Sequence, residues 1–179
     1  YFPEATCHLI EPQPACAPTL KVLGGNTGFR FHAFALAERP GEVLMNKSGR
    51  PNTGAQIKLS PDEETIAVAA TTLDALFDKS LSVGDRTLLK MDLQGYELHA
   101  LRGGESILPS IEVIFTEVSF FGQAYEPSIV ELVTFLKAHD FELYDIASLM
   151  GRSRDNRLCQ GDFIFVRKDS QLAQDKRWN

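Results

Sequence analysis

Three acidic residues stand directly after apolar segments that predict β-strands. They are Glu11 in "LIEP", Asp92 in "LKMDLQG" and Glu117 in "IFTEV". In open α/β sheets, ligands bind outside the carboxyl ends of the strands, near the point where the strand order reverses. Any one of these acids is explained equally well as a cap of the following helix, and Asp92 is well placed for that role. The coincidence of three acids favours a binding site, so we expect them to gather on one rim of a sheet around a cleft.

Carboxylates in these positions can do two kinds of chemistry. An acid after an early strand of a dinucleotide-type fold can accept two hydrogen bonds from a ribose, and Glu11 has this position. A carboxylate beside a bound hydroxyl compound can act as the general base that removes the hydroxyl proton. Asp92 and Glu117 are candidates for that role, with Glu97 third. For Glu97 the simpler interpretation is an acid that favours the dipole of a helix in its first turn.

Several other catalytic motifs are missing from the sequence. It has no G-x-S-x-G elbow, which leaves hydrolase chemistry without support, and no G-x-x-x-x-G-K-[ST] loop, which argues against a nucleotide triphosphatase. The absence of G-x-G-x-x-G argues against a dehydrogenase.

The four histidines share no spacing, so we interpret them as structural; they are His8, His32, His99 and His139.

The composition predicts a globular domain without nucleic-acid or membrane partners. The chain has 179 residues, of which 44% are hydrophobic and 23% charged, enough for a packed core. Its net charge of -6 disfavours anionic partners, and the basic cluster of Arg152, Arg154 and Arg157 is interpreted as a solvated loop. No apolar run approaches the length of a membrane span.

Three cysteines without C-x-x-C spacing indicate no zinc site and a reduced, cytoplasmic setting.

Strands and helices alternate along the chain, which predicts an α/β fold with a largely parallel sheet. We expect residues 24 and 25 to end the first helix, residues 42–46 to pair back on the preceding strand as a hairpin, and residues 47–64 to form an exposed loop. The last two strands, joined without a helix, should be antiparallel. The tail from Asp169 should be loose. Strands are expected at 5–12, 29–37, 42–46, 65–73, 88–91, 111–118, 141–146 and 162–168, and helices at 15–23, 74–79, 95–102 and 127–140.

At "TTLDAL", "LLKMDLQGYELHALRGGESIL" and "FTEV" the sequence resembles the FkbM family of S-adenosylmethionine-dependent methyltransferases. The resemblance extends in order from "LIEPQP" through "ALAERPGEV" to the final "GDFIFVRK". Its strongest segment is the K-x-D-x-x-G-x-E pattern at Lys90, Asp92, Gly95 and Glu97. Gln94 is a departure, because family members often have Glu there, and the lost charge argues against a metal-binding role.

The resemblance implies a Rossmann-like methyltransferase fold with the strand order 3-2-1-4-5-7-6 and an antiparallel last strand. It also implies S-adenosylmethionine as the cofactor. Glu11, followed by Pro12, would bind the ribose after strand 2. Ala35 and Leu36, where strand 3 ends, would flank the adenine. Asp92 would follow strand 4 and face the methionine part of the cofactor or the methyl acceptor.

The first strand and the Gly-rich loop of the family have no counterpart in this sequence. That loop holds the carboxypropyl end of the cofactor, and here Tyr1 stands just before strand 2. We expect additional residues ahead of Tyr1, because the strand edges beside a missing central strand would keep unpaired backbone groups. The methyltransferase domain would then be N-terminally incomplete and cover residues 1–168, followed by a polar tail at 169–179.

The activity that the resemblance suggests is O-methylation of a small hydroxyl compound such as a sugar or a polyketide. Methyl transfer from a sulfonium is an in-line displacement with a good leaving group, so positioning supplies much of the rate. A non-catalytic binding module that keeps the fold is the alternative. The expected partner is the small-molecule acceptor, with no nucleic acid and no membrane, and self-association could cover apolar faces that are left over.

Overall fold

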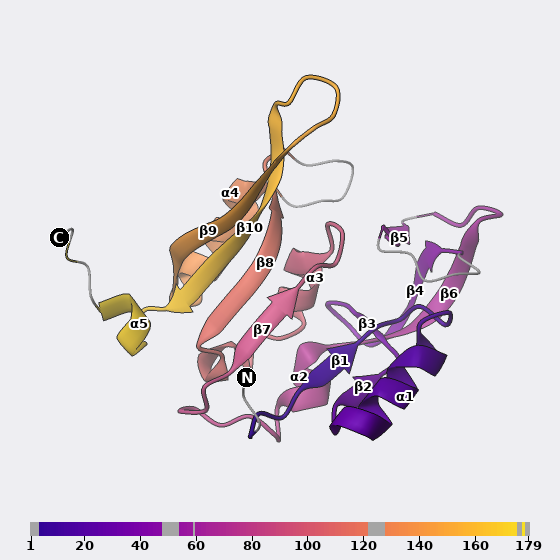
Figure 1. The fold of residues 1–179 in the computed structure, drawn as a ribbon, viewed down its shortest axis with the longest axis horizontal. Helices are drawn as coiled ribbons and strands as arrows, with labels where there is room; N and C mark the ends of the chain where they lie inside the picture. Colours follow the sequence, from indigo (N-terminus) through magenta and orange to yellow (C-terminus); the bar gives the residue numbers. More distant parts are fainter. Residues whose placement is uncertain (1–3, 48–53, 59, 122–127, 175–176, 178–179) are drawn as a thin grey trace. The chain divides into compact units, whose positions relative to one another are not determined.

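The computed structural model describes residues 4–47, 54–58, 60–121, 128–174 and 177. The chain divides into two compact units, Tyr1–Thr72 and Leu73–Asn179. Both units contain helices and strands, so the α/β class is confirmed (Figure 1). They alternate in much of the second unit, whereas in the described part of the first unit α1 is followed by five strands, β2 to β6. No helix in the described part of the chain is both long and apolar enough to cross a membrane.

In the first unit, strands β1 (His8–Ile10) and β2 (Arg30–His32) form a parallel pair. Parallel pairing needs a crossover, which helix α1 (Ala17–Thr27) supplies. This helix continues past Gly24 and Gly25, so the expected end there was wrong. It stops at Gly28, whose φ of 76° is left-handed and whose N–H bonds to the Gly24 carbonyl at 3.0 Å.

The second sheet of this unit contains β3 (Ala35–Leu36), β4 (Gly41–Asn46), β5 (Ile57–Lys58) and β6 (Thr65–Thr71), in the order β3-β6-β4-β5. Two expectations were wrong here. The strand predicted at 29–37 is divided between two sheets, and β4 pairs with β6 instead of folding back on that strand. The longer β6 offers a register partner to all six β4 residues, which the two residues of β3 cannot do.

The expected exposed loop at 47–64 is only partly described. Residues 48–53 and 59 lie outside the described residues. Within the remainder, β5 pairs antiparallel with β4, so this stretch contributes an edge strand to the sheet.

The second unit is built on a mixed sheet with the order β7-β8-β10-β9 (Figure 1). Strands β7 and β8 are parallel, while β10 is antiparallel to both of its neighbours, which confirms the expected antiparallel closing pair. Within the described residues, both four-stranded sheets are therefore mixed and the β1–β2 pair is parallel, so the largely parallel sheet expected from the sequence is not confirmed. The elements of this unit are α2 (Leu73–Phe77), β7 (Leu88–Met91), α3 (Glu97–Arg102), η1 (Leu108–Ser110), β8 (Val113–Ser119), α4 (Ile129–Ala138), β9 (Phe141–Gly151), β10 (Leu158–Arg167) and α5 (Gln171–Gln174).

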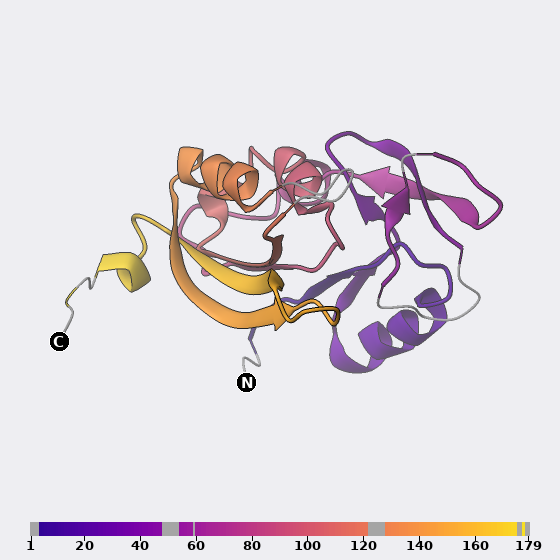
Figure 2. The same cartoon turned by 90° about the horizontal axis from the view of Figure 1, so that it is seen from above.

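The core of the second unit lies between this sheet and the helices α3 and α4, which Figure 2 shows along one side of it. Burial alternates along β8, because successive side chains of a strand point to opposite faces. Ile114, Thr116 and Val118 are buried, and Leu101 of α3 and Leu136 of α4 are fully buried with them. The opposite face of the sheet is the more open one.

Helix α4 begins with a reciprocal capping box. Ser128 Oγ accepts the Glu131 N–H at 3.4 Å, and Glu131 Oε2 accepts the Ser128 N–H at 2.9 Å. We expect Ser128→Ala to lower the free energy of unfolding by about 1 kcal/mol, because it removes one of these bonds. Urea unfolding followed by circular dichroism measures this, with Ser153→Ala in an exposed turn as the control. Equal stability of both variants would contradict the contribution of the capping box.

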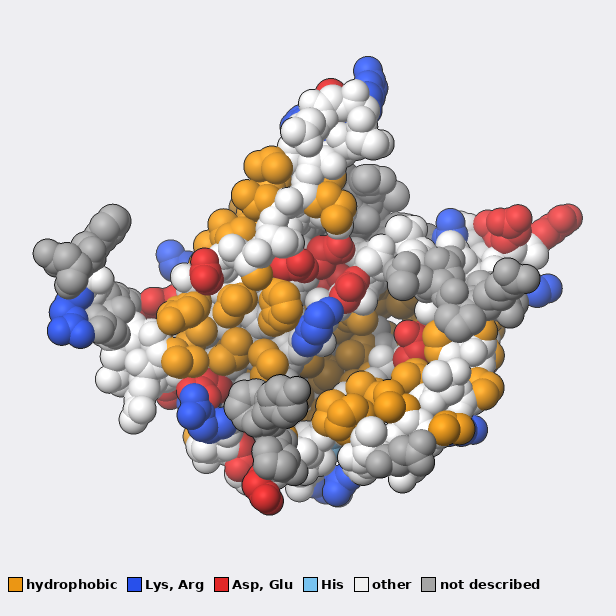
Figure 3. Space-filling view, in the orientation of Figure 1, with side chains coloured by type: hydrophobic (Ala, Val, Ile, Leu, Met, Phe, Trp, Pro, Cys, Tyr) orange, Lys and Arg blue, Asp and Glu red, His pale blue; other side chains and the backbone are white. Residues whose placement is uncertain are grey.

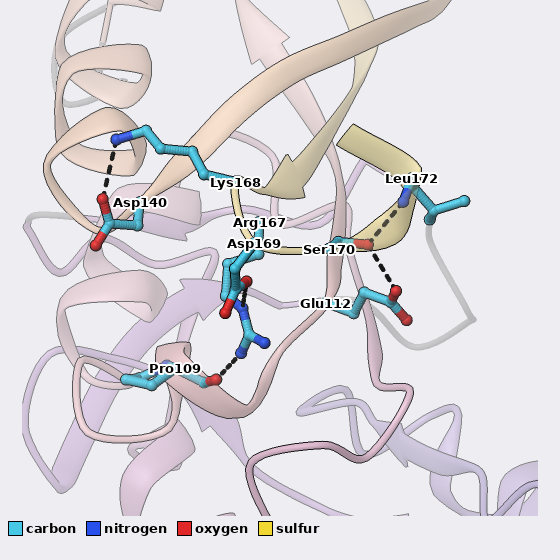
Figure 4. Close-up of polar contacts among 8 residues, drawn as sticks. All are labelled: Pro109, Glu112, Asp140, Arg167, Lys168, Asp169, Ser170 and Leu172. Atoms are coloured by element: carbon cyan, nitrogen blue, oxygen red, sulfur yellow. Dashed lines mark hydrogen bonds and ion pairs between the residues drawn. The ribbon is translucent and has the colours of Figure 1, made fainter. Parts of the chain in front are cut away.

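The segment after β10 is held against the sheet (Figure 4). The Arg167 guanidinium contacts the Pro109 carbonyl, and Ser170 Oγ donates to Glu112 Oε1 at 2.7 Å. The Ser170 hydrogen bond is the largest cause that lowers the pKa of the Glu112 carboxyl, although burial opposes it. Residues 169–174 thus have fixed contacts and end in α5, in contrast to the loose tail expected from the sequence.

Candidate active site

Asp92 and Glu117 lie at the same edge of the second unit's sheet. Asp92 directly follows β7, and Glu117 is close to the end of β8. These strands are adjacent and parallel, with Met91 opposite Thr116, so both acids stand at the carboxyl edge. Two of the three strand-end acids are therefore neighbours. Glu11 belongs to the first unit, and its convergence with them stays a prediction.

Asp92 does not cap helix α3. The N-cap position is Tyr96, and no side chain caps that helix. Asp92 Oδ1 instead accepts a hydrogen bond from Gln94 Nε2 at 2.7 Å, and Lys90 Nζ lies 3.8 Å from Oδ2. The Asp92 side chain is 54% exposed, so a bound molecule can reach its carboxylate.

A tight turn between β7 and α3 holds Asp92 at this edge. Gln94 and Gly95 have φ angles of 52° and 96°, and the left-handed region is unusual for a residue such as Gln94. Such conformations collect at functional sites, where surrounding contacts enforce them. The Leu93 N–H donates to Glu97 Oε1 at 2.8 Å and fastens the turn from inside. The K-x-D-x-x-G-x-E pattern thus folds as a strand end, a turn and a helix start.

Glu97 lies beneath the rim and is only 3% exposed. Burial raises the pKa of its carboxyl to about 7, against the hydrogen bonds that it receives from its own backbone and from Leu93. The charges of Glu117 and Asp92 raise the pKa further. The interaction with the helix dipole would favour the charged form, but burial outweighs it. The structure therefore places Glu97 as a support of the turn, while a catalytic role stays a prediction.

Glu117 has polar neighbours from β9 and β10 that the sequence interpretation missed. Gln160 Nε2 donates to Glu117 Oε1 at 2.5 Å, and Asp162 stands directly opposite Glu117 in the antiparallel register. Ser148 Oγ in turn donates to Asp162 Oδ2 at 2.6 Å. The polar residues at the start of the last strand could have indicated a site from the sequence. Only the register of β10 on β8 shows that Gln160 and Asp162 lie beside Glu117.

The open face of the sheet combines this acidic edge with an apolar surface. Figure 3 shows Asp and Glu side chains gathered beside an apolar area over β8 and β10. Phe115 and Glu117 point to this face, and Lys90 Nζ lies 5.7 Å from the centroid of the Phe115 ring. A ligand could therefore meet an apolar surface and a carboxylate side by side.

In the first unit, Glu11 sits at the turn that follows β1. The Gln13 N–H donates to Glu11 Oε1 at 2.8 Å, and the Glu11 N–H donates to the His32 carbonyl at 3.1 Å. The chain, including the half-buried Pro12, thus bends around the carboxylate. Within the described residues, the second oxygen, Oε2, has no hydrogen-bond partner. It is suitably placed to accept a hydrogen bond from a ligand hydroxyl.

Ala35 and Leu36 are 2% and 6% exposed and belong to β3. They pair with Ala70 and Thr71 of β6, so they do not end the same strand as Arg30–His32. The division of the predicted strand explains this difference. That the two residues flank an adenine stays a prediction.

A pocket of about 270 Å³ lies away from the acidic edge, between α4, β9 and β10. Phe165 in its lining pairs with Ile114, at the opposite end of β8 from Glu117. The pocket is lined by Val133, Lys137, Phe141, Glu142, Leu143, Phe165 and Lys168.

Among the described residues, no group of three or more His, Cys, Asp or Glu could hold a metal ion.

The model of the Methyltransferase FkbM domain matches the chain over residues 2–143. The chain belongs to this family. Its general chemistry is therefore methyl transfer. No curated protein and no solved structure matches the chain. The FkbM match includes the K-x-D-x-x-G-x-E pattern and Glu117, whereas Gln160 and Asp162 on β10 lie beyond it.

Proposed function

We propose that this FkbM-family chain transfers the methyl group of S-adenosylmethionine to a hydroxyl group of a small molecule, such as a sugar or a polyketide. The observation that carries the proposal is the pair of acids, Asp92 and Glu117, on adjacent strand ends inside the family match. One of them is open to solvent, and a carboxylate of this kind can accept the proton that a hydroxyl group must lose.

The strand order supports a Rossmann-like methyltransferase fold. The order β7-β8-β10-β9, with β10 antiparallel, corresponds to strands 4-5-7-6 of the expected sheet. The parallel pair β1–β2 corresponds to strands 2 and 3. In that fold the cofactor lies along the carboxyl ends of the strands. Glu11 follows a strand in the first unit, and Asp92 and Glu117 stand at strand ends in the second.

The residues at these strand ends suit the proposed cofactor. The second carboxylate oxygen of Glu11 can accept hydrogen bonds from a ribose. The acidic edge around Asp92 and Glu117 suits a cationic group, because opposite charges attract. When bound, S-adenosylmethionine would supply an electrophilic methyl group on a sulfonium, and loss of that methyl group leaves a neutral thioether.

The roles of the chain's own residues follow from their surroundings. Asp92, whose carboxylate is exposed, would take up the proton of the acceptor hydroxyl, and S-adenosylmethionine, when bound, would supply the methyl group. Glu117 orients the acceptor and is itself held by Gln160. Glu97 keeps the Asp92 turn in place through the Leu93 N–H. Alignment of the reacting groups then supplies much of the rate.

Glu11→Gln tests the cofactor site. We expect the Kd for S-adenosylmethionine to rise about 10- to 100-fold, because hydrogen bonds to a charged group contribute roughly 1.5–3 kcal/mol. Isothermal titration calorimetry measures this, with Glu42→Gln, exposed on β4, as the control. An unchanged Kd for Glu11→Gln would remove Glu11 from the site. Absence of binding both by this chain and by a version extended ahead of Tyr1 would favour the non-catalytic module.

The cysteines support a cytoplasmic setting for this reaction. Cys7, Cys16 and Cys159 are all free thiols in the structure. Free thiols are typical of reducing compartments, whereas disulfides form and persist in oxidising ones. We therefore place the proposed reaction in the cytoplasm.

A further inference from the structure

The turn between β9 and β10 concentrates positive charge in an acidic protein. Residues 152–157 contain three arginines and one acid, Asp155, so their formal charge is 3 − 1 = +2, against -6 for the whole chain. Arg154 and Arg157 are exposed. This basic turn lies outside the residues matched by the family model.

Hydrogen bonds give the basic turn a defined shape. Arg152 binds Asp155 through two bonds, Nε to Oδ1 at 2.6 Å and Nη2 to Oδ2 at 2.5 Å. The Arg157 N–H also donates to Asp155 Oδ1, at 3.1 Å. Asp155 therefore neutralises Arg152, whereas Arg154 has no ion pair within the described residues. Arg154 and Arg157 carry the positive charge that remains.

An aromatic side chain lies beside these arginines. The guanidinium carbon of Arg157 is 4.8 Å from the centroid of the Phe121 ring, and that of Arg152 is 5.9 Å away. A guanidinium that stacks on an aromatic face keeps the N–H groups at its edge for an anion. Since the Phe120 N–H donates to the Cys159 carbonyl at 2.9 Å, Phe121 and the basic turn are held at the end of β8.

The basic turn lies at the same end of the sheet as the acidic edge. Strand β10 begins at Leu158, directly after the turn, and its Asp162 stands opposite Glu117 of β8. Strand β8 ends at Ser119, and Phe121 follows two residues later. This end of the sheet is therefore acidic at Glu117 and basic at Arg154 and Arg157.

We propose that Arg154 and Arg157, with Phe121, form an anion-binding subsite for the methyl acceptor. The acceptor is then an elongated hydroxyl compound with a phosphate or carboxylate group apart from the hydroxyl that is methylated. Guanidinium groups bind such groups through paired N–H donors. This inference rests on the proposed function, because only that function makes the acidic edge the place of reaction.

The subsite is tested first with inorganic phosphate as the probe. Titration followed by two-dimensional NMR should show saturable shifts of the amides at 152–157 in the unchanged protein. The double variant Arg154→Gln/Arg157→Gln should weaken this binding at least about tenfold. Arg39→Gln, an exposed arginine of the first unit, is the control. No saturable shift in the unchanged protein, or equal binding by the double variant, would overturn the subsite.

A second measurement separates this inference from the proposed function. The acceptors are a hydroxylated disaccharide and the same disaccharide with a terminal phosphate or carboxylate. The double variant should raise KM for the anionic acceptor at least about tenfold and leave the neutral one unchanged, because only the anion meets the arginines. Equal effects on both acceptors would refute the subsite. Phosphate binding at the turn without S-adenosylmethionine binding would refute the proposed function and retain the subsite.

Discussion

Asp92→Asn is expected to lower kcat for methyl transfer by about 10²- to 10⁴-fold, the usual contribution of a general base. The fold should be unaffected, because the Asp92 side chain is half exposed and its carboxylate contacts the polar side chains of Gln94 and Lys90. An amide cannot take up the hydroxyl proton, although it has nearly the same shape. Formation of S-adenosylhomocysteine, followed by liquid chromatography, measures kcat, and circular dichroism checks the fold.

A matched variant shows whether the loss is specific to the site. Asp78→Asn changes an exposed aspartate of the same unit that lies outside the candidate site, and it should retain full activity. If Asp92→Asn also retained activity, Asp92 would not be the base, and Glu117→Gln would be the next variant to measure. If Asp92→Asn lost activity together with its circular dichroism signal, a structural role would explain the loss instead.

The second large expected effect is that Glu97 makes the free energy of unfolding fall as the pH rises. Burial raises the pKa of this carboxyl from 4.5 to about 7. Between these values the folded protein keeps the proton and the unfolded chain releases it, so the free energy of unfolding falls as the pH rises. The stabilisation is complete below pH 4.5 and is lost as the pH passes 7. Its size is roughly 3 kcal/mol.

Glu97→Gln should remove this dependence. The glutamine oxygen can still accept the Leu93 N–H, but the side chain has no proton to lose, so the variant should gain stability relative to the unchanged protein between pH 4.5 and 7. Urea unfolding at a series of pH values measures the difference. Glu63→Gln, an exposed glutamate, is the control and should follow the unchanged protein. If the free energies of unfolding of Glu97→Gln and of the unchanged protein changed with pH in parallel, the Glu97 carboxyl would not be buried as the structure places it.

Local features were predictable from the sequence. The apolar run that ends at Asp92, with glycine three residues later, predicted a strand, a turn and a helix, and the structure has all three. Short-range patterns also predicted the acids after β1 and β7 and the antiparallel pair β9–β10. These features depend on residues a few positions apart, whose backbone preferences and apolar periodicity are visible in the sequence.

Features that depend on distant partners were not predictable. The segment 29–37 has a continuous strand pattern, yet it is divided because its two parts pair with different strands, β1 and β6. The C-terminal tail was expected to be loose from its polar sequence. The hydrogen bond that holds it, from Ser170 to Glu112, spans 58 residues and is not visible in the local sequence. The free energy of strand pairing comes from contacts with the partner strand and from burial, so the strand propensity of a segment cannot predict which strand it pairs with.

By itself, the sequence determined the family pattern, the α/β class and the acids at the strand ends, because all three depend on residue type and short spacing. Only the tertiary structure decided that Glu97 is buried beneath Asp92, that Gln160 and Asp162 flank Glu117, and that the basic turn stands beyond them. Burial and strand register arise when segments far apart in the chain pack together. They set the charge and the accessibility of each side chain, and these properties in turn set the chemistry of the rim.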